Sequence, residues 1–248
     1  MNPINKLFNN MDTWRHLPAY QLERRADIFF SIYLPEVLSD KFQTEIEGII
    51  PEFPVHIGSI TTIHTNKSFK IDYLAKAKNK ILFVELKTDE GSRRGAQDLY
   101  LEQAKLVGVA KLLDGLSKIC QATTSKRKYN HLLGHLDELG LIHLESSGNF
   151  GILPGEYEIE IVYIQPNNPY GQKNVITFKD FAEIVERHDD EVSRRFAESL
   201  RRWADTKAGD GEKTGDWRLG TGDAKVKRKG AKDVGQVKVD SRKLKGGK

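Results

Sequence analysis

The sequence predicts an α/β fold in which helices flank a central mixed β-sheet. Three observations lead to this prediction. Helical patterning precedes a group of short apolar strands, long helices follow that group, and further strands come after those helices. The expected order of helix, three strands, helix, strand and helix is typical of an α/β sandwich. All these elements fall within residues 1–204, which we expect to form one domain.

The helical region before the strands is expected in two pieces. Helical patterning begins near Ala19. Pro35 is expected to open a second helix, because proline is favoured at the first helical position. This second helix should reach about Gly48, and Pro51 and Pro54 should end it.

Three strands are expected next, at Val55–His64, Phe69–Ala75 and Ile81–Thr88. A short turn around residues 78–79 joins the second strand to the third. We therefore expect these two strands to form a hairpin.

Helices and strands alternate again in the second half of the domain. A long helix is expected over residues 96–121 and another over residues 127–140. Residues 156–165 are predicted to form a strand, because they are rich in β-branched and aromatic side chains. A short strand near residues 175–178 should lead into helices that end near Trp203.

Residues 205–248 differ in composition from the rest of the chain. They hold 13 Lys and Arg, 7 Asp and Glu, and 9 of the 21 glycines. Of the chain's net charge of +4, this segment carries +6 and residues 1–204 carry −2. We expect a basic, Gly- and Lys-rich disordered tail, because such a segment cannot bury enough apolar surface to offset its ordering entropy.

The sequence also predicts the cellular compartment of the protein. The chain has no apolar run near the ~18 residues of a membrane span. Its first residues lack the basic and apolar blocks of a signal peptide. Cys120 is the only cysteine, so no internal disulfide can form. We therefore expect a cytoplasmic protein that does not engage a membrane.

Three charged residues interrupt the apolar strands of the predicted hairpin. Asp72 lies in its first strand, and Glu85 and Lys87 end its second. Charges in such strands are costly unless they are paired or bind a ligand. Glu85 and Lys87 are two residues apart and point to one side. A two-residue turn at residues 78–79 sets a register that places Asp72 directly opposite Glu85.

Two opposed carboxylates favour a bound cation. Opposed Cβ atoms lie ~4.5–5.5 Å apart, where like charges destabilise a sheet. A divalent cation would remove that cost, and oxygen ligands favour Mg²⁺ or Mn²⁺. Lys87 could orient or deprotonate a water molecule, or stabilise charge that develops on a phosphate. With a metal that activates water, this set meets the requirements of phosphodiester hydrolysis.

The hairpin resembles the PD-(D/E)XK nuclease superfamily. Asp72 in one strand and Glu85-Leu-Lys87 at the end of the next match the family's bipartite motif, although Ile71 stands where proline is usual. The match covers roughly residues 19–165 and implies a restriction-endonuclease-like three-layer sandwich. It also implies that Asp72 and Glu85 bind Mg²⁺ and that Lys87 acts in catalysis.

The resemblance implies further site residues. The family often adds an acidic residue from the first helix, for which Glu23 is the leading candidate and Glu45 and Glu47 are rivals. Its nucleases also often carry a glutamine on the helix after the Glu-x-Lys motif. Gln97 would fill that position, with Gln103 as a second option.

Two arginines lie between the hairpin and the long helix. Arg93 and Arg94 belong to a polar loop at residues 89–94. Beside a metal site, such a loop could hold phosphates of a nucleic acid. The alternative is a polar loop that only leads into the helix.

The expected function is metal-dependent hydrolysis of phosphodiester bonds in DNA, by an endonuclease of defence, restriction or repair. One alternative is a catalytically inactive nucleic-acid-binding or regulatory protein on the same fold. Another is an interaction protein whose hairpin charges are structural. The intact Asp72, Glu85 and Lys87 favour an enzyme, and cutting both strands would favour a homodimer.

Overall fold

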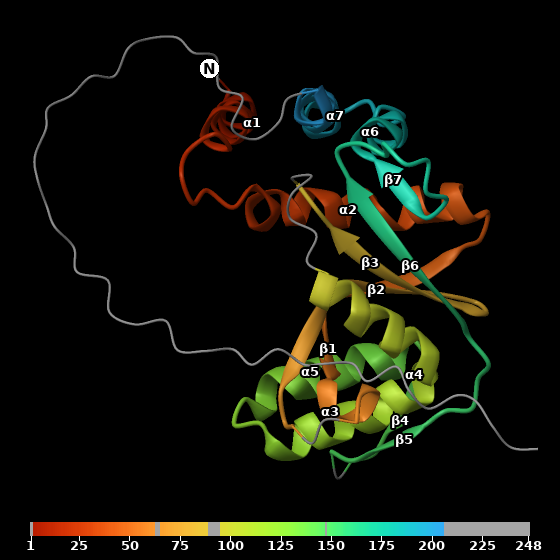
Figure 1. Ribbon diagram of the computed structural model, residues 1–248. Helices are drawn as coiled ribbons and strands as arrows, with labels where there is room; N and C mark the ends of the chain where they lie inside the picture. Colours follow the sequence, from red (N-terminus) through yellow and green to blue (C-terminus); the bar gives the residue numbers. More distant parts are fainter. Residues whose placement is uncertain (1, 63–64, 89–94, 147, 206–248) are drawn as a thin grey trace, which may run out of the picture. The chain divides into compact units, whose positions relative to one another are not determined.

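The computed structural model describes residues 2–62, 65–88, 95–146 and 148–205 (Figure 1). In chain order, the helices and strands within these ranges are α1 (Pro3–Trp14), α2 (Leu22–Phe42), β1 (Ile46–His56), α3 (Ile57–Ile60), β2 (Ser68–Ala77), β3 (Lys80–Leu86), α4 (Gly95–Ala122), α5 (Lys126–Glu138), β4 (Ile142–Leu144), β5 (Phe150–Ile152), β6 (Glu158–Gln165), β7 (Val175–Thr177), α6 (Phe178–Val185) and α7 (Glu191–Asp205).

Five of the strands form one mixed sheet in the order β1-β2-β3-β6-β7. β2 runs antiparallel to both β1 and β3. β6 runs parallel to both β3 and β7. Parallel neighbours need a crossover connection, and the segment from α4 to β5 provides the one between β3 and β6.

Helices cover both faces of this sheet (Figure 1). Helices α1, α2, α6 and α7 contribute buried side chains to one hydrophobic core, and α3, α4 and α5 contribute to another. Successive residues of β3 enter the two cores alternately: Leu82 and Val84 enter the first, Ile81 and Phe83 the second. The predicted α/β fold with a mixed sheet between helices is confirmed, and it is compatible with a three-layer sandwich.

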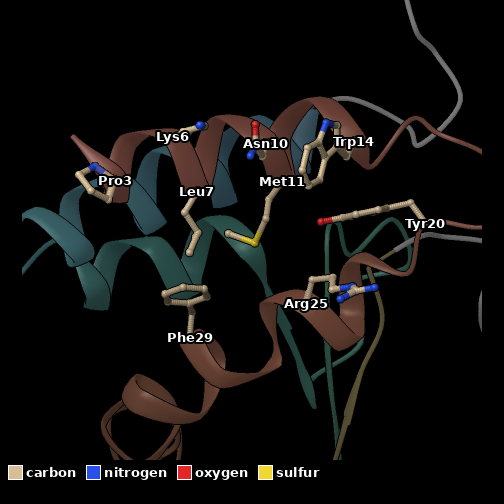
Figure 2. A pocket seen from close by; sticks show the side chains of 9 residues that line it. All are labelled: Pro3, Lys6, Leu7, Asn10, Met11, Trp14, Tyr20, Arg25 and Phe29. Carbon is tan, nitrogen blue, oxygen red and sulfur yellow. The ribbon is translucent and has the colours of Figure 1, made fainter. Parts of the chain in front are cut away.

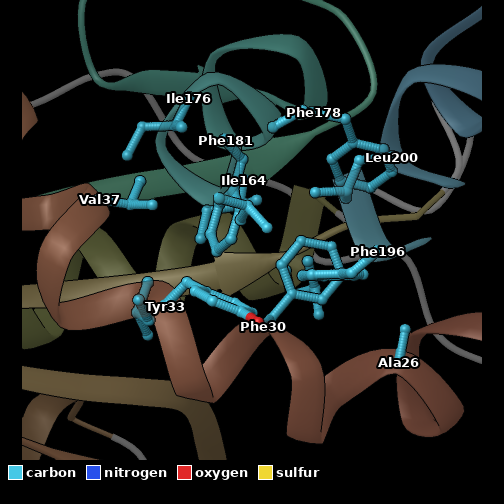
Figure 3. Packing of buried hydrophobic residues seen from close by; sticks show 14 of the residues in the cluster. Ala26, Phe30, Tyr33, Val37, Ile164, Ile176, Phe178, Phe181, Phe196 and Leu200 are labelled. Atoms are coloured by element: carbon cyan, nitrogen blue, oxygen red, sulfur yellow. The ribbon is translucent and has the colours of Figure 1, made fainter. Parts of the chain in front are cut away.

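Aromatic side chains fill the first core (Figure 3). The ring centroid of Phe30, on α2, lies 5.5, 5.0 and 5.2 Å from those of Phe178, Phe181 and Phe196. These four side chains are fully buried. Such tilted and edge-to-face pairs contribute about 0.5–1.5 kcal/mol each beyond the area they bury. They fix α2 against α6 and α7.

Helix α2 continues through Pro35, where the sequence predicted that a separate helix would begin. Proline removes a backbone donor and disfavours a helix interior. However, Phe30, Leu34 and Leu38 are fully buried along this helix. Burial of that face offsets the local penalty, because packing supplies most of a helix's stability in a folded protein. The predicted break is therefore wrong.

The first strand lies earlier than predicted. β1 begins at Ile46, within the expected end of the helix, and α3 occupies residues 57–60 of the strand expected at Val55–His64. Pro51 and Pro54 lie inside β1 and do not end a helix. Prolines are tolerated there because β1 is an edge strand of the described sheet.

The remaining predicted elements lie close to their expected positions. Strands β2, β3, β6 and β7 and helices α4 and α5 all overlap their predicted ranges. The sequence did not predict α1, which the Asn2 side chain caps by accepting from the N–H of Ile4 at 2.9 Å, or the β4–β5 hairpin. Helix α4 is kinked at Gly108, whose φ of 79° suits glycine.

The predicted tail lies almost wholly outside the described residues. Asp205 is the last residue of α7, and residues 206–248 are not described. The boundary at residue 204 and the disorder of the tail therefore stay predictions. In the part of the chain that is described, no helix is both long enough and apolar enough to span a membrane.

The aromatic core gives the first testable prediction. Phe30→Ala should lower the free energy of unfolding by about 3–5 kcal/mol, because it removes a ring that packs against three others and leaves a cavity. Urea denaturation measures the loss. Ile28→Ala is the control on the same helix: Ile28 is 64% exposed, and its truncation should change stability by less than about 0.5 kcal/mol. Equal losses in the two variants would contradict this assignment of the core.

Candidate active site

The register of the β2–β3 hairpin positions the predicted site. Tyr73 pairs with Val84 and Lys76 with Ile81, in the register that a two-residue turn at residues 78–79 requires. One step further along the strands, Asp72 and Glu85 are opposite each other. The register predicted from the sequence is therefore confirmed.

Lys87 lies between the two carboxylates. Its Nζ is 2.9 Å from Oε2 of Glu85 and 3.8 Å from Oδ2 of Asp72. Glu85 is fully buried, and Lys87 is 6% exposed. The backbone N–H of Leu86 also donates to Oδ2 of Asp72 at 2.8 Å. The three predicted residues thus form one cluster at the end of the hairpin, in which Glu85 and Lys87 are buried and Asp72 is partly exposed.

Glu85 is only partly satisfied by its neighbours. Its Oε2 accepts hydrogen bonds from Lys87 and from Nε2 of Gln97, on α4. Its Oε1 is buried and has no hydrogen-bond partner within the described part of the chain. Burial and the negative charge of Asp72 raise the pKa of Glu85 to about 7, against the opposing effect of Lys87. An unpaired buried oxygen is unusual, because most buried polar atoms in proteins have a hydrogen-bond partner.

A polar pocket of about 350 Å³ opens beside this cluster. Its walls come from the start of α2, from β1 and from β2 and β3. Four of its lining residues are acidic and two are basic: Glu23, Asp27, Glu52 and Asp72, and Arg24 and Lys70, with Leu86 completing the lining. The ion pair of Lys70 with Glu52 lies at its exposed side.

Glu23 is the helix glutamate that the structure brings to the site. Burial and the charge of Asp72 raise the pKa of Glu23, while Lys87 lowers it. The rivals lie elsewhere: Glu47 is on β1 and forms an ion pair with Lys76, and Glu45 immediately precedes that strand. Neither rival lies on a helix or lines the pocket.

The pKa of Asp72 is raised as well, and burial is the main cause. Lys87 and the N–H of Leu86 act in the opposite direction. For Lys87, burial lowers the pKa, but the charges of Glu85 and Asp72 outweigh it and the pKa is raised. The site therefore holds crowded carboxylates around one ammonium group that stays charged at neutral pH.

Two further acidic residues at this pocket were not predicted. Asp27 follows Glu23 by one helical turn, and its carbonyl oxygen and carboxylate both accept from the Tyr73 hydroxyl, the carbonyl at 3.0 Å. Glu52 comes from β1, which the sequence placed incorrectly. The i, i+4 spacing of Glu23 and Asp27 was a signal that could have identified Asp27.

The remaining predicted residues do not join the cluster. Gln103 is exposed on α4, whereas Gln97 contacts Glu85 directly. Arg93 and Arg94, together with the loop at residues 89–94, lie outside the described residues. Their predicted role with phosphates stays a prediction.

The donors present suit a hard divalent cation. Among the described residues, no group of three or more His, Cys, Asp or Glu side chains is arranged to hold a metal ion. Mg²⁺, however, commonly keeps several waters and binds only one or two carboxylates together with substrate phosphates. The carboxylate of Asp72, which lines the pocket, and that of Glu85, on the other side of Lys87, fit that mode of binding.

Comparisons with family models, curated proteins and solved structures give no match for this chain.

The pKa of Glu85 gives a prediction about stability. Its folded-state pKa of about 7 exceeds its ordinary value of 4.5. The proton on Glu85 therefore stabilises the fold fully below about pH 4.5, and this contribution is lost as the pH rises through about 7. Glu85→Gln stays neutral throughout. Its unfolding free energy should equal that of the wild type near pH 4.5 and exceed it by about 1–3 kcal/mol above pH 7.

Urea denaturation between pH 4.5 and 8 measures this difference. The control is Glu102→Gln, which changes an exposed glutamate on α4 and should stay within about 0.5 kcal/mol of the wild type at every pH. Parallel stability curves for Glu85→Gln and the wild type would show that Glu85 is already ionised at low pH.

Proposed function

We propose that this protein is a metal-dependent nuclease of the PD-(D/E)XK kind, on a restriction-endonuclease-like three-layer sandwich. One observation carries the proposal: Lys87 lies between Asp72 and Glu85 at the end of a hairpin, beside an acidic pocket. This is the arrangement that the motif resemblance implies. The expected substrate is DNA.

Asp72 and Glu85 would hold the cation, Mg²⁺ or Mn²⁺. Both carboxylates have a raised pKa, so a cation that replaces protons would relieve the crowding of negative charge. Glu23 lines the same pocket and can bind a metal-bound water. When bound, the ion supplies polarisation of the scissile phosphate and a lower pKa for the attacking water.

Lys87 serves as a charged donor. Its raised pKa keeps the ammonium group protonated, so it is suited to stabilise negative charge that develops on the phosphate, and not to act as a base. It is held in place by Glu85 and Asp72, which lie on both sides of its Nζ. This preorganisation limits the reorganisation that the reaction requires.

Gln97 acts as a positioning residue. Its amide donates to the same Glu85 oxygen that Lys87 contacts. That contact would hold the carboxylate of Glu85 in a fixed orientation. The kink of α4 at Gly108 lies well beyond Gln97, so the first turns of α4 carry the amide to the site.

A second candidate function is a non-catalytic nucleic-acid-binding or regulatory protein on the same fold. The observation that favours it is the ion pairing within the cluster, since Lys87 already neutralises part of the charge that a cation would bind. Divalent cation binding separates the two candidates. A homodimer would fit a nuclease that cuts both strands.

Cleavage of supercoiled plasmid tests the nuclease. With Mg²⁺ or Mn²⁺, the wild type should nick or linearise the plasmid, and EDTA should prevent this. Lys87→Ala and Asp72→Ala should each lower the rate at least about 100-fold, because each removes a group that binds the ion or stabilises the transition state. Agarose gel electrophoresis measures the products.

The matched control is Glu45→Ala. This residue is one of the two rival acids, is exposed and does not line the pocket, so cleavage should stay within about threefold of the wild type. Activity that survives in Lys87→Ala and Asp72→Ala would assign the cleavage to another site or protein. No cleavage of plasmid, single-stranded DNA or RNA by the wild type would favour the non-catalytic candidate.

A further inference from the structure

A second pocket, of about 420 Å³, lies between α1 and α2 (Figure 2). Trp14 and Leu7 from α1, Tyr20 from the following loop and Phe29 from α2 form apolar walls. This volume is within the range of small-molecule sites, about 300–1,000 Å³.

The aromatic walls of this pocket are open to solvent. Trp14 is 45% exposed. Its ring centroid lies 6.3 Å from that of Tyr20, at an interplanar angle of 72°. Phe29, by contrast, packs against Phe8 and Phe196, at 4.9 and 5.7 Å between centroids, which gives the pocket a rigid base. A planar ligand would bury apolar surface that the fold leaves exposed.

Two cations border the aromatic walls. Lys6 comes from α1 and Arg25 from α2 (Figure 2). Within the described residues, neither forms an ion pair. Burial raises the pKa of Tyr20, and the positive charge of Arg25 opposes this rise. The guanidinium group therefore lies close enough to the Tyr20 hydroxyl to interact with it electrostatically. Within the described part of the chain, the pocket thus combines an apolar aromatic surface with positive charge that is not in an ion pair.

Helix α2 links this pocket to the candidate active site. Glu23 and Asp27 line the active-site pocket, whereas Arg25 and Phe29 line the second one. At 3.6 residues per turn, these two pairs lie on the two flanks of the helix, on either side of its buried face. The two pockets are therefore separated by one helix, about 10–12 Å across with its side chains.

We infer that the second pocket binds an unpaired nucleobase, with Arg25 and Lys6 each holding a phosphate of the same strand. The inference rests on the proposed nuclease function and names the substrate class: a nucleic acid that is single-stranded at this position. Aromatic stacking suits any base, because every base has a π-face, and cations beside it track the backbone. A base within an intact duplex cannot enter such a pocket unless it leaves the stack.

The test is binding of a fluorescein-labelled, 12-nucleotide single-stranded DNA to the full chain in EDTA, measured by fluorescence anisotropy. Trp14→Ala should weaken binding by about 5- to 100-fold, because stacking contributes about 1–3 kcal/mol per base. A double variant, Lys6→Glu with Arg25→Glu, should also weaken it and should flatten the salt dependence by about 1.4 in log–log slope. Duplex DNA of the same sequence should bind Trp14→Ala as it binds the wild type.

Two controls accompany these variants. Trp14→Phe keeps a stacking surface and should stay within about threefold of the wild type. Leu106→Ala removes a side chain that is 75% exposed on α4, away from the pocket lining, and should have no effect. The charge variant leaves the apolar walls intact, so it tests the inference even if Trp14→Ala destabilises the fold.

Single-strand binding at wild-type strength by either test variant would overturn the inference, and so would a wild type that binds no single strand. Displacement of a bound anilinonaphthalene sulfonate by a fatty acid but not by the oligonucleotide would assign the pocket to a small amphipathic anion instead. The nuclease proposal is judged separately. Metal-dependent plasmid cleavage that is lost in Lys87→Ala stands even if the second pocket binds no base.

Discussion

The antiparallel register of β2 and β3 constrains everything else at the candidate site. It places the carboxylates of the partly exposed Asp72 and the buried Glu85 at opposed positions of the sheet, where like charges repel. Lys87 makes this arrangement tolerable, because its ammonium group contacts both. A slip of one residue in the register would turn these side chains to the other face, so the turn at residues 78–79 determines whether the cluster exists.

The cluster lowers stability locally, and the two hydrophobic cores compensate for it. Glu85 is fully buried with an unpaired oxygen, and its pKa of about 7 reflects the energetic cost of its ionised form. By contrast, the aromatic core around Phe30 holds α2 rigidly against α6 and α7. Proteins commonly retain such unfavourable electrostatics where a ligand or a reaction makes use of it.

The parts of the site that the sequence could predict are those that local geometry determines. Asp72, Glu85 and Lys87 lie within one hairpin, so strand alternation and a short turn were enough to bring them together. Asp27 and Glu52 reach the pocket through α2 and β1. The position of β1 depends on long-range pairing that tolerates Pro51 and Pro54 at a sheet edge, and the continuity of α2 depends on burial that outweighs Pro35. Local propensities do not contain this information.

Helix α2 is the element that relates the two pockets. Its buried residues Leu22, Ala26 and Phe30 follow one another at intervals of four and fix the rotation of the helix about its axis. Once that rotation is set, Glu23 must face the acidic pocket and Arg25 the aromatic one. The two side chains cannot be repositioned independently without exposing the buried face. A nucleic-acid strand bound in the aromatic pocket would therefore reach the carboxylate cluster at a fixed distance. Packing of the core would set that distance between the binding pocket and the candidate active site.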